Sequence, residues 1–221
     1  MDTASFAEAR RLMVLGQLRP SGVMDARILA AMGTLPRERF VPADLAARAY
    51  SDAAIPLPGG RMMPSPLTAA RLAELAAVRR DDRVLVLGAG SGFGAALFGA
   101  LGARVVAVEE DADLLALARV ALSASVAPGA VQLVAASARE GHAAGAPYDA
   151  ILIEGAVPAL PRAIEEQLAE GGRLVTILAP AGGTSRAMLV RRVGQSFTPV
   201  AGFDAPSWPA PAFAAEPAFI F

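Results

Sequence analysis

The stretch Arg83–Asp111, RVLVLGAGSGFGAALFGALGARVVAVEED, predicts how this chain folds. It opens with an apolar run, Val84–Leu87, that is short enough for a buried strand, and an apolar helical segment follows at Ala95–Leu101. A second apolar run, Val105–Val108, ends in acidic residues. A strand, a loop, a helix and a second strand within about thirty residues are typical of a βαβ crossover unit.

The loop of this unit contains glycines at every second position, Gly88, Gly90 and Gly92. Glycine lets the backbone approach a ligand closely, and the start of the following helix offers free N–H groups to an anionic group. Glu109 lies at the tip of the second strand, about twenty residues on, where an acid accepts hydrogen bonds from ribose hydroxyls. We therefore expect Gly88, Ala89, Gly90, Gly92 and Glu109 to bind an adenosine-type cofactor.

The identity of that cofactor depends on the glycine spacing. The fingerprint of hydride carriers needs glycine or alanine at its sixth position, which is Phe93 when counted from Gly88. Counted from Gly90 the fingerprint fits, but the loop then begins two residues late relative to the end of the predicted strand. The alternating glycines suit S-adenosyl-L-methionine better. Glu110 is the alternative ribose acid if the strand ends one residue later, and a bare packing loop is the structural alternative.

Composition limits the other classes of function. The chain has 221 residues, of which 54% are hydrophobic and 19% charged, which supports a packed core. The net charge of −1 gives no basic field for nucleic acid or membrane. No apolar run is long enough for a bilayer span and the N-terminus lacks a signal peptide's apolar core, so we expect a cytoplasmic protein. The absence of cysteine and a single histidine argue against a metal site.

The rest of the chain alternates predicted strands and helices, which indicates an α/β fold with a doubly wound, Rossmann-like parallel sheet. We expect an N-terminal helical extension over residues 1–80 and the sheet domain over residues 81–221, ending in an antiparallel pair of strands and a tail, Trp208–Phe221. Further predicted helices are Phe6–Leu18, Ala26–Met32, Leu67–Val78, Asp113–Ala124 and Pro161–Leu168, and further strands are Val131–Val134, Tyr148–Ile153, Arg173–Leu178, Ala187–Val193 and Phe197–Phe203.

Several segments spread over nearly the whole chain match one known family. They are Leu35–Pro42, Ala49–Asp52, Ile55–Leu57, Val84–Phe93, Glu109, Ala146–Leu152 and Leu168–Val175. In these segments the chain resembles the protein-L-isoaspartate O-methyltransferases, and the most specific of them precede the glycine loop. The resemblance implies the class I methyltransferase fold, S-adenosyl-L-methionine as methyl donor, and a side-chain carboxylate of an isoaspartyl-containing protein or peptide as acceptor. Nothing distinguishes a monomer from a weak dimer.

The chain departs from the family pattern on the acceptor side. The family's Gly-Gln-Thr-Ile-Ser-Gln-Pro stretch is matched by Gly60–Pro66, so Met62 and Pro64 stand where threonine and serine usually stand. The family's Gly-Asp-Gly is matched by Ala136–Ala138, and a threonine after the fourth strand is matched by Glu154. Val86 replaces an acid that the family usually has within the first strand.

Five of these residues are further candidates for the site. Arg61 can form a bidentate pair with an acceptor carboxylate, with a solvent-exposed surface arginine as the alternative. Ser65 offers a hydroxyl one residue after the position where the family has its serine. Ser137 and Ala138 are candidates for the adenine contact. Glu154 lies at a strand end, where open α/β sheets bind ligands, with a salt bridge or helix cap as its alternative. The rival functions are a methyltransferase for another acceptor and a cofactor-binding module without turnover.

Overall fold

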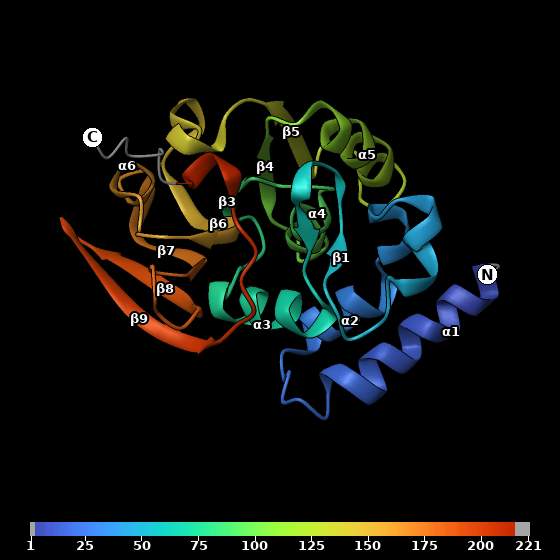
Figure 1. Cartoon of the computed structure of the whole chain (residues 1–221). Helices are drawn as coiled ribbons and strands as arrows, with labels where there is room; N and C mark the ends of the chain where they lie inside the picture. Colours follow the sequence, from blue (N-terminus) through green and yellow to red (C-terminus); the bar gives the residue numbers. More distant parts are fainter. Residues whose placement is uncertain (1–2, 215–221) are drawn as a thin grey trace, which may run out of the picture.

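The computed structural model describes residues 3–214 and is built on a seven-stranded sheet (Figure 1). The strand order is β5-β4-β3-β6-β7-β8-β9, in which the first five strands are parallel and the last two antiparallel. This confirms the Rossmann-like sheet and its antiparallel end. The strands are β3 (Arg83–Leu87), β4 (Arg104–Glu109), β5 (Val131–Ala135), β6 (Tyr148–Val157), β7 (Leu168–Leu178), β8 (Arg186–Val193) and β9 (Ser196–Asp204).

The strand order reverses beside β3, which pairs with β4 on one side and with β6 on the other. The helix after β3 packs on one face of the sheet, and the short helix after β6 packs on the other. Such a reversal opens a crevice at the carboxyl ends of the two central strands, where α/β proteins bind ligands. Gly88 follows the last residue of β3, and Glu154 follows Ile153, the last residue of β6 that pairs with β3.

Most helices cover one face of the sheet. The doubly wound sheet that the sequence predicts therefore has one face covered by several helices and the other covered mainly by short segments. On the other face the described residues place only α6 and short 3-10 segments. The first face includes the helices that pack against Val84, Val86 and Ala107. The helices are α1 (Thr3–Met13), α2 (Ala26–Thr34), α3 (Pro66–Ala76), α4 (Phe93–Ala100), α5 (Ala112–Ser123) and α6 (Arg162–Glu165).

Two predicted elements have different bounds in the structure. The predicted helix Pro161–Leu168 is wrong beyond α6, because Leu168 pairs with Tyr148 and opens β7. The predicted strand Tyr148–Ile153 is too short, because β6 continues past Gly155 through a register shift. Gly155 has a φ of 112°, a conformation that glycine adopts without strain. In the sequence such a glycine indicates the end of a strand, whereas here the strand continues through it as an irregularity.

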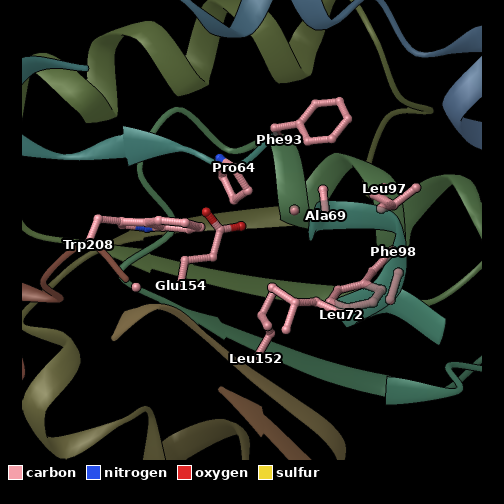
Figure 2. Close-up of a pocket in the computed structure, with 12 residues that line it drawn as sticks. Pro64, Ala69, Leu72, Phe93, Leu97, Phe98, Leu152, Glu154 and Trp208 are labelled. Atoms are coloured by element: carbon pink, nitrogen blue, oxygen red, sulfur yellow. The ribbon is translucent and has the colours of Figure 1, made fainter. Parts of the chain in front are cut away.

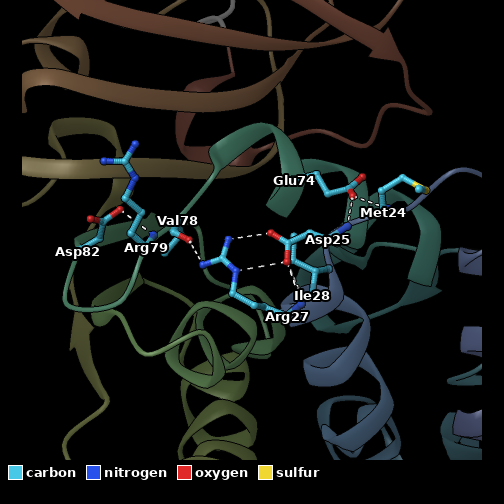
Figure 3. Close-up of polar contacts among 8 residues, drawn as sticks. All are labelled: Met24, Asp25, Arg27, Ile28, Glu74, Val78, Arg79 and Asp82. Carbon is cyan, nitrogen blue, oxygen red and sulfur yellow. Dashed lines mark hydrogen bonds and ion pairs between the residues drawn. The ribbon is translucent and has the colours of Figure 1, made fainter.

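Polar contacts around the start of α2 join this helix to α3 and to the segment that follows α3 (Figure 3). Asp25 is the N-cap residue of α2 and accepts hydrogen bonds from the backbone N–H groups of Arg27 and Ile28. Glu74 of α3 accepts from the backbone N–H of Asp25, at 3.0 Å, and Arg27 donates to the carbonyl of Val78, also at 3.0 Å. These contacts orient α2 across the end of α3.

The predicted helix Phe6–Leu18 also changes character along its length. It forms α1 to Met13 and continues as a π-helical segment, η1 (Val14–Leu18), ahead of the turn at Gly22. Leu18 is fully buried, whereas Leu12 and Leu15 are about half exposed. The wider turn therefore directs Leu18 into the core.

One hydrophobic cluster joins the N-terminal segment to the sheet. It contains residues from both proposed regions, among them Met32, Phe40, Phe93 and Val84. The division at residue 80 stays a prediction. In Figure 1, α1 lies at one end of the molecule and β8 and β9 at the other. Part of the predicted tail, residues 215–221, lies outside the described residues. No helix within residues 3–214 has the length and apolar character that crossing a bilayer requires.

Candidate active site

The glycine loop between β3 and α4 has the backbone geometry that its sequence predicts. Gly88, Gly90 and Gly92 have φ values of 63°, 55° and 87°, which residues other than glycine rarely adopt. Gly92 directly precedes the first residue of α4, so the loop delivers the chain to the helix N-terminus. Ala89 donates its N–H to the carbonyl of Val108, which holds the loop against β4. The loop therefore forms a cradle at the carboxyl edge of the sheet.

Glu109 is the last residue of β4, which confirms the predicted strand end, and its side chain is only 1% exposed. Its carboxylate accepts from the backbone N–H of Gly90 at 2.7 Å, and from those of Glu110 and Asp111 at 2.9 and 3.1 Å. These bonds aim one oxygen at the glycine loop. Glu110, the alternative ribose acid, is exposed.

Arg61 contacts Glu109, although 48 residues separate the two in the chain. One guanidinium nitrogen, Nη1, lies 3.2 Å from a carboxylate oxygen of Glu109. The other, Nη2, donates to the carbonyl of Gly88 and, at 3.4 Å, to that of Glu154. Arg61 is only 8% exposed, so the surface alternative for this residue is wrong.

A short hairpin places Arg61 over the loop. Strands β1 (Ile55–Pro56) and β2 (Met62–Met63) pair across a tight 3-10 turn, Pro58–Gly60. Gly59 has a φ of 66°, and a β-carbon there would lie 2.8 Å from Asp111. The hairpin therefore packs closely against the end of β4.

Glu154 lies in an apolar pocket beside the loop (Figure 2). Its carboxyl group points between Pro64 and Trp208, and the N–H of Gly94 donates to it. Burial raises the pKa of Glu154 to about 8; Arg61 opposes this shift, and Glu109 adds to it. The other residues that line the pocket are mostly aliphatic and aromatic: Ala69, Leu72, Ala73, Phe93, Leu97, Phe98 and Leu152.

Gly94 is required by this arrangement, because a β-carbon there would lie 1.9 Å from a carboxyl oxygen of Glu154. The sequence gives no signal for that contact, because Gly94 and Glu154 are 60 positions apart in the chain and two strands, β4 and β5, lie between them. The carboxyl group of Glu154 accepts from the N–H of Gly94 in the first turn of α4, which is the contact that the helix-cap alternative describes, and no salt bridge involves Glu154 among residues 3–214. Its expected role as a strand-end ligand group stays a prediction.

One charged neighbour of Glu154, Arg37, was not apparent from the sequence as part of the site. Arg37, in the Leu35–Pro42 segment, is fully buried and donates to the carbonyls of Ala49 and Pro64 at 2.8 and 2.7 Å. Its guanidinium carbon lies 4.4 Å from the ring centroid of Phe93. Burial lowers the pKa of Arg37 to about 9. The available signal was the pair of arginines in this proline-bracketed segment.

The acceptor-side candidate Ser65 has a structural role in α3. It is the N-cap residue, whose hydroxyl oxygen accepts from the N–H of Thr68 at 3.3 Å and also contacts the Thr68 hydroxyl at 3.1 Å. Pro64 precedes it and lines the Glu154 pocket, and Met63 is buried. The structure therefore brings Ser65 near the pocket but gives its hydroxyl two local partners.

The adenine-side candidates lie at the far end of the crevice. Ala138 is buried, whereas Ser137 is exposed and its side chain accepts from the N–H of Arg139 at 3.4 Å. The C-terminal segment reaches this region: Pro211 and Phe213 line a small cavity together with Arg61, Glu109 and Ala138. The segment is anchored because Ala156 donates to the carbonyl of Trp208 at 2.7 Å.

The glycine loop and Glu109 are arranged as a nucleoside-type cofactor requires. The glycine cradle, the start of α4 and the aimed oxygen of Glu109 are the groups that such a cofactor needs. The side chain of Arg61 occupies part of the same space, since a β-carbon on Gly88 would lie 3.0 Å from its Nη2. No cluster of three potential metal-ligating side chains occurs within residues 3–214.

The fold and this site define a class I, S-adenosyl-L-methionine-dependent type of methyltransferase. A sequence profile of the family described as "Protein-L-isoaspartate(D-aspartate) O-methyltransferase" matches residues 9–198. The protein-L-isoaspartate O-methyltransferase of Methylorubrum populi is 42% identical over 189 residues, 86% of this chain and 88% of that protein. The chain belongs to the protein-L-isoaspartate O-methyltransferase family.

Solved structures show the same fold. A protein-L-isoaspartate O-methyltransferase structure has a TM-score of 0.79 over 91% of this chain at 23% identity, and the chain spans 65% of that structure's length. A Plasmodium falciparum protein described as a member of the same family, in complex with S-adenosyl-L-homocysteine, has a TM-score of 0.76 at 16% identity. It matches 89% of this chain and 95% of its own length. At these identities the likeness concerns the fold.

Proposed function

We propose that this protein transfers a methyl group from S-adenosyl-L-methionine to the side-chain carboxylate of isoaspartyl residues in proteins or peptides. The observation that carries the proposal is 42% identity over 86% of the chain with a relative of that name, together with the glycine loop and Glu109 at the same sheet edge. A cytoplasmic location, predicted from the sequence, belongs to the proposal as well.

The cofactor would be held by the central crevice. Gly88, Ala89 and Gly90 would pass the methionine part, and Glu109 would accept hydrogen bonds from the ribose. Ser137 and Ala138 would lie beside the adenine, and Gly92 would set the start of α4. When bound, S-adenosyl-L-methionine supplies an electrophilic methyl group on a sulfonium sulfur.

The chain's own task is then alignment and exclusion of water. A carboxylate oxygen is an adequate nucleophile at neutral pH, so no general base is needed, and the protein must hold oxygen, methyl carbon and sulfur in line. The apolar walls of the Glu154 pocket, Phe93 and Leu152 among them, keep water away. Arg61 and Ser65 are the proposed donors to the acceptor carboxylate.

The replaced acceptor segment predicts weak activity on isoaspartyl peptides. Pro64 has neither a hydroxyl nor an N–H, Met62 removes a second hydroxyl, and the Ser65 hydroxyl that would donate to the acceptor also caps α3. Loss of well-placed donors costs about tenfold to a thousandfold in rate at a preorganised site. We expect tritiated methyl transfer to an isoaspartyl peptide to be slower by this factor than with a family member that has the full motif, assayed in parallel.

The comparison also distinguishes the rival functions. Equal rates would contradict the weakened acceptor site and leave the proposed function intact. Binding of S-adenosyl-L-homocysteine without methylation of isoaspartyl peptide would favour another acceptor or a module without turnover. The altered residues Met62, Pro64 and Glu154 are the observation that favours another acceptor.

The ribose assignment predicts unequal effects of two neighbouring acids. Glu109→Gln should weaken S-adenosyl-L-homocysteine binding by about 1–3 kcal/mol, the range for removing a charged hydrogen-bond partner, because it neutralises the buried oxygen aimed at the crevice. Glu110→Gln is the matched control, since Glu110 is exposed. Titration calorimetry measures both. Equal losses, or a larger loss for Glu110→Gln, would refute the assignment.

A further inference from the structure

The acid that should bind the cofactor ribose already has a charged partner. Glu109 receives three backbone N–H groups, and Arg61 Nη1 lies 3.2 Å from the oxygen that also faces Gly90. Both side chains are almost completely buried, at 9% and 1% exposure. A ribose hydroxyl that approached this oxygen would have to take the place of the guanidinium.

Arg61 also closes the crevice between the two central strands. Its Nη2 donates to the carbonyl of Gly88 at the end of β3 and to that of Glu154 in β6. These two strands flank the reversal of strand order, where α/β sheets open for ligands. The cofactor and the guanidinium therefore compete for one volume as well as for one oxygen.

The position of Arg61 is incompletely satisfied. Its Nε is buried without a hydrogen-bond partner among the described residues, which leaves one donor of the guanidinium unused. An unpaired buried donor weakens the state that contains it. The backbone that holds Arg61 is a hairpin of two-residue strands whose residues Ile55 and Met63 belong to the main buried cluster, so a release of Arg61 needs a new conformation of its side chain and no movement of the hairpin.

We propose that Arg61 couples cofactor binding to acceptor binding: it occupies Glu109 when the cofactor is absent, and cofactor binding releases its guanidinium to hold the acceptor's carboxylate. This inference rests on the proposed function. Arg61 directly precedes the segment Met62–Ser65, so the released side chain lies next to the cleft that Pro64 and Glu154 line. Arg61 is then a positioning residue whose partner changes from a protein acid to a substrate acid.

Two thermodynamic consequences follow from this exchange. Because the pair with Glu109 stabilises only the cofactor-free state, it lowers the apparent affinity for the cofactor. Because the released guanidinium is available only in the cofactor-bound state, the cofactor raises the affinity for an anionic acceptor, and the acceptor raises the affinity for the cofactor by the same factor.

The test measures binding of S-adenosyl-L-homocysteine by calorimetry to wild type, Arg61→Gln and Arg61→Met. We expect both variants to bind about tenfold more tightly than wild type, as when a competing state is removed. Arg79→Gln is the matched control, because it removes the same charge from an exposed site and should leave the affinity unchanged. Arg61→Met keeps an aliphatic stem in case Arg61→Gln folds poorly, and thermal unfolding checks both.

A second measurement follows a fluorescent isoaspartyl peptide by anisotropy, with and without saturating S-adenosyl-L-homocysteine. In wild type the peptide should bind about fivefold more tightly with the cofactor product present, and in Arg61→Gln this difference should disappear. An unchanged peptide affinity in wild type would overturn the release of Arg61 to the acceptor.

The outcomes separate this inference from the proposed function. If wild type methylates the peptide but both Arg61 variants bind S-adenosyl-L-homocysteine no more tightly than it does, the inference is wrong and the function stands. If neither wild type nor the variants bind it, both are wrong. Binding by the variants alone would support the pair with Glu109 as a block on the cofactor site.

Discussion

Replacing Phe93 by alanine is expected to lower the free energy of unfolding by about 3–5 kcal/mol, the range for deleting a buried aromatic side chain. Phe93 is the first residue of α4 and only 2% exposed. Its ring packs edge-on against Phe40, with centroids 5.5 Å apart, and carries the buried guanidinium of Arg37 on its face. The substitution therefore opens a cavity and removes a cation–π contact.

Urea denaturation at pH 7 would measure this loss, with Phe197→Ala as a control. Phe197 lies half-buried on β9, at the edge of the sheet, so its loss should be clearly smaller. Similar losses for the two variants would show that Phe93 is not a central packing residue. Because Phe93 also lines the Glu154 pocket, the variant should bind the acceptor peptide poorly even where it remains folded.

The second large effect concerns pH. Burial raises the pKa of Glu154 from its ordinary 4.5 to about 8 in the folded protein. The folded state therefore holds a proton on Glu154 that the unfolded state releases above pH 4.5. The stability from this group is fully present below pH 4.5 and is lost as the pH rises towards 8.

We expect wild type to lose stability relative to Glu154→Gln between pH 5 and pH 8, by at most about 4 kcal/mol, since each pKa unit corresponds to about 1.4 kcal/mol. Glutamine keeps the shape of the side chain and an oxygen that can accept from Gly94, but it does not ionise. Denaturation curves of both proteins at several pH values would measure the difference.

The comparison with Glu154→Gln isolates one group among several that titrate. Glu165 also has a raised pKa through burial, and it is common to both proteins, so its contribution cancels. The charged groups that face Glu154 are Arg61, Glu109 and Arg37. Parallel stability profiles for the two proteins would show that Glu154 ionises at its ordinary pKa, in which case it is a solvated carboxylate.

Much of the cofactor side was predictable because it is local in the chain. The strand, loop, helix and strand of Arg83–Asp111 follow from apolar runs and glycines that act on neighbouring residues. The left-handed φ values of Gly88, Gly90 and Gly92 and the strand end at Glu109 agree with the sequence. The bounds of β6 and α6 were less predictable, because strand pairing rather than local pattern decided them.

The acceptor side depended on contacts between distant residues. The sequence assigned Arg61 to a substrate carboxylate and Glu109 to a ribose, but not to each other, although their side chains form an ion pair across 48 positions. In the same way, it gave Ser65 a role with the acceptor, whereas the fold uses the hydroxyl to cap α3. Nothing in the sequence indicated that Arg37 would be buried, because its surroundings come from distant parts of the chain.

The sequence by itself determined the class of this protein: a parallel α/β sheet with a glycine loop and an acid at the next strand tip, because those features depend on spacing along the chain. Tertiary structure alone decided what surrounds Glu109 and Glu154. The topology brings the ends of β3 and β6 together under a hairpin that precedes both strands in the chain, and burial there decides which charges pair and which carboxyl keeps its proton.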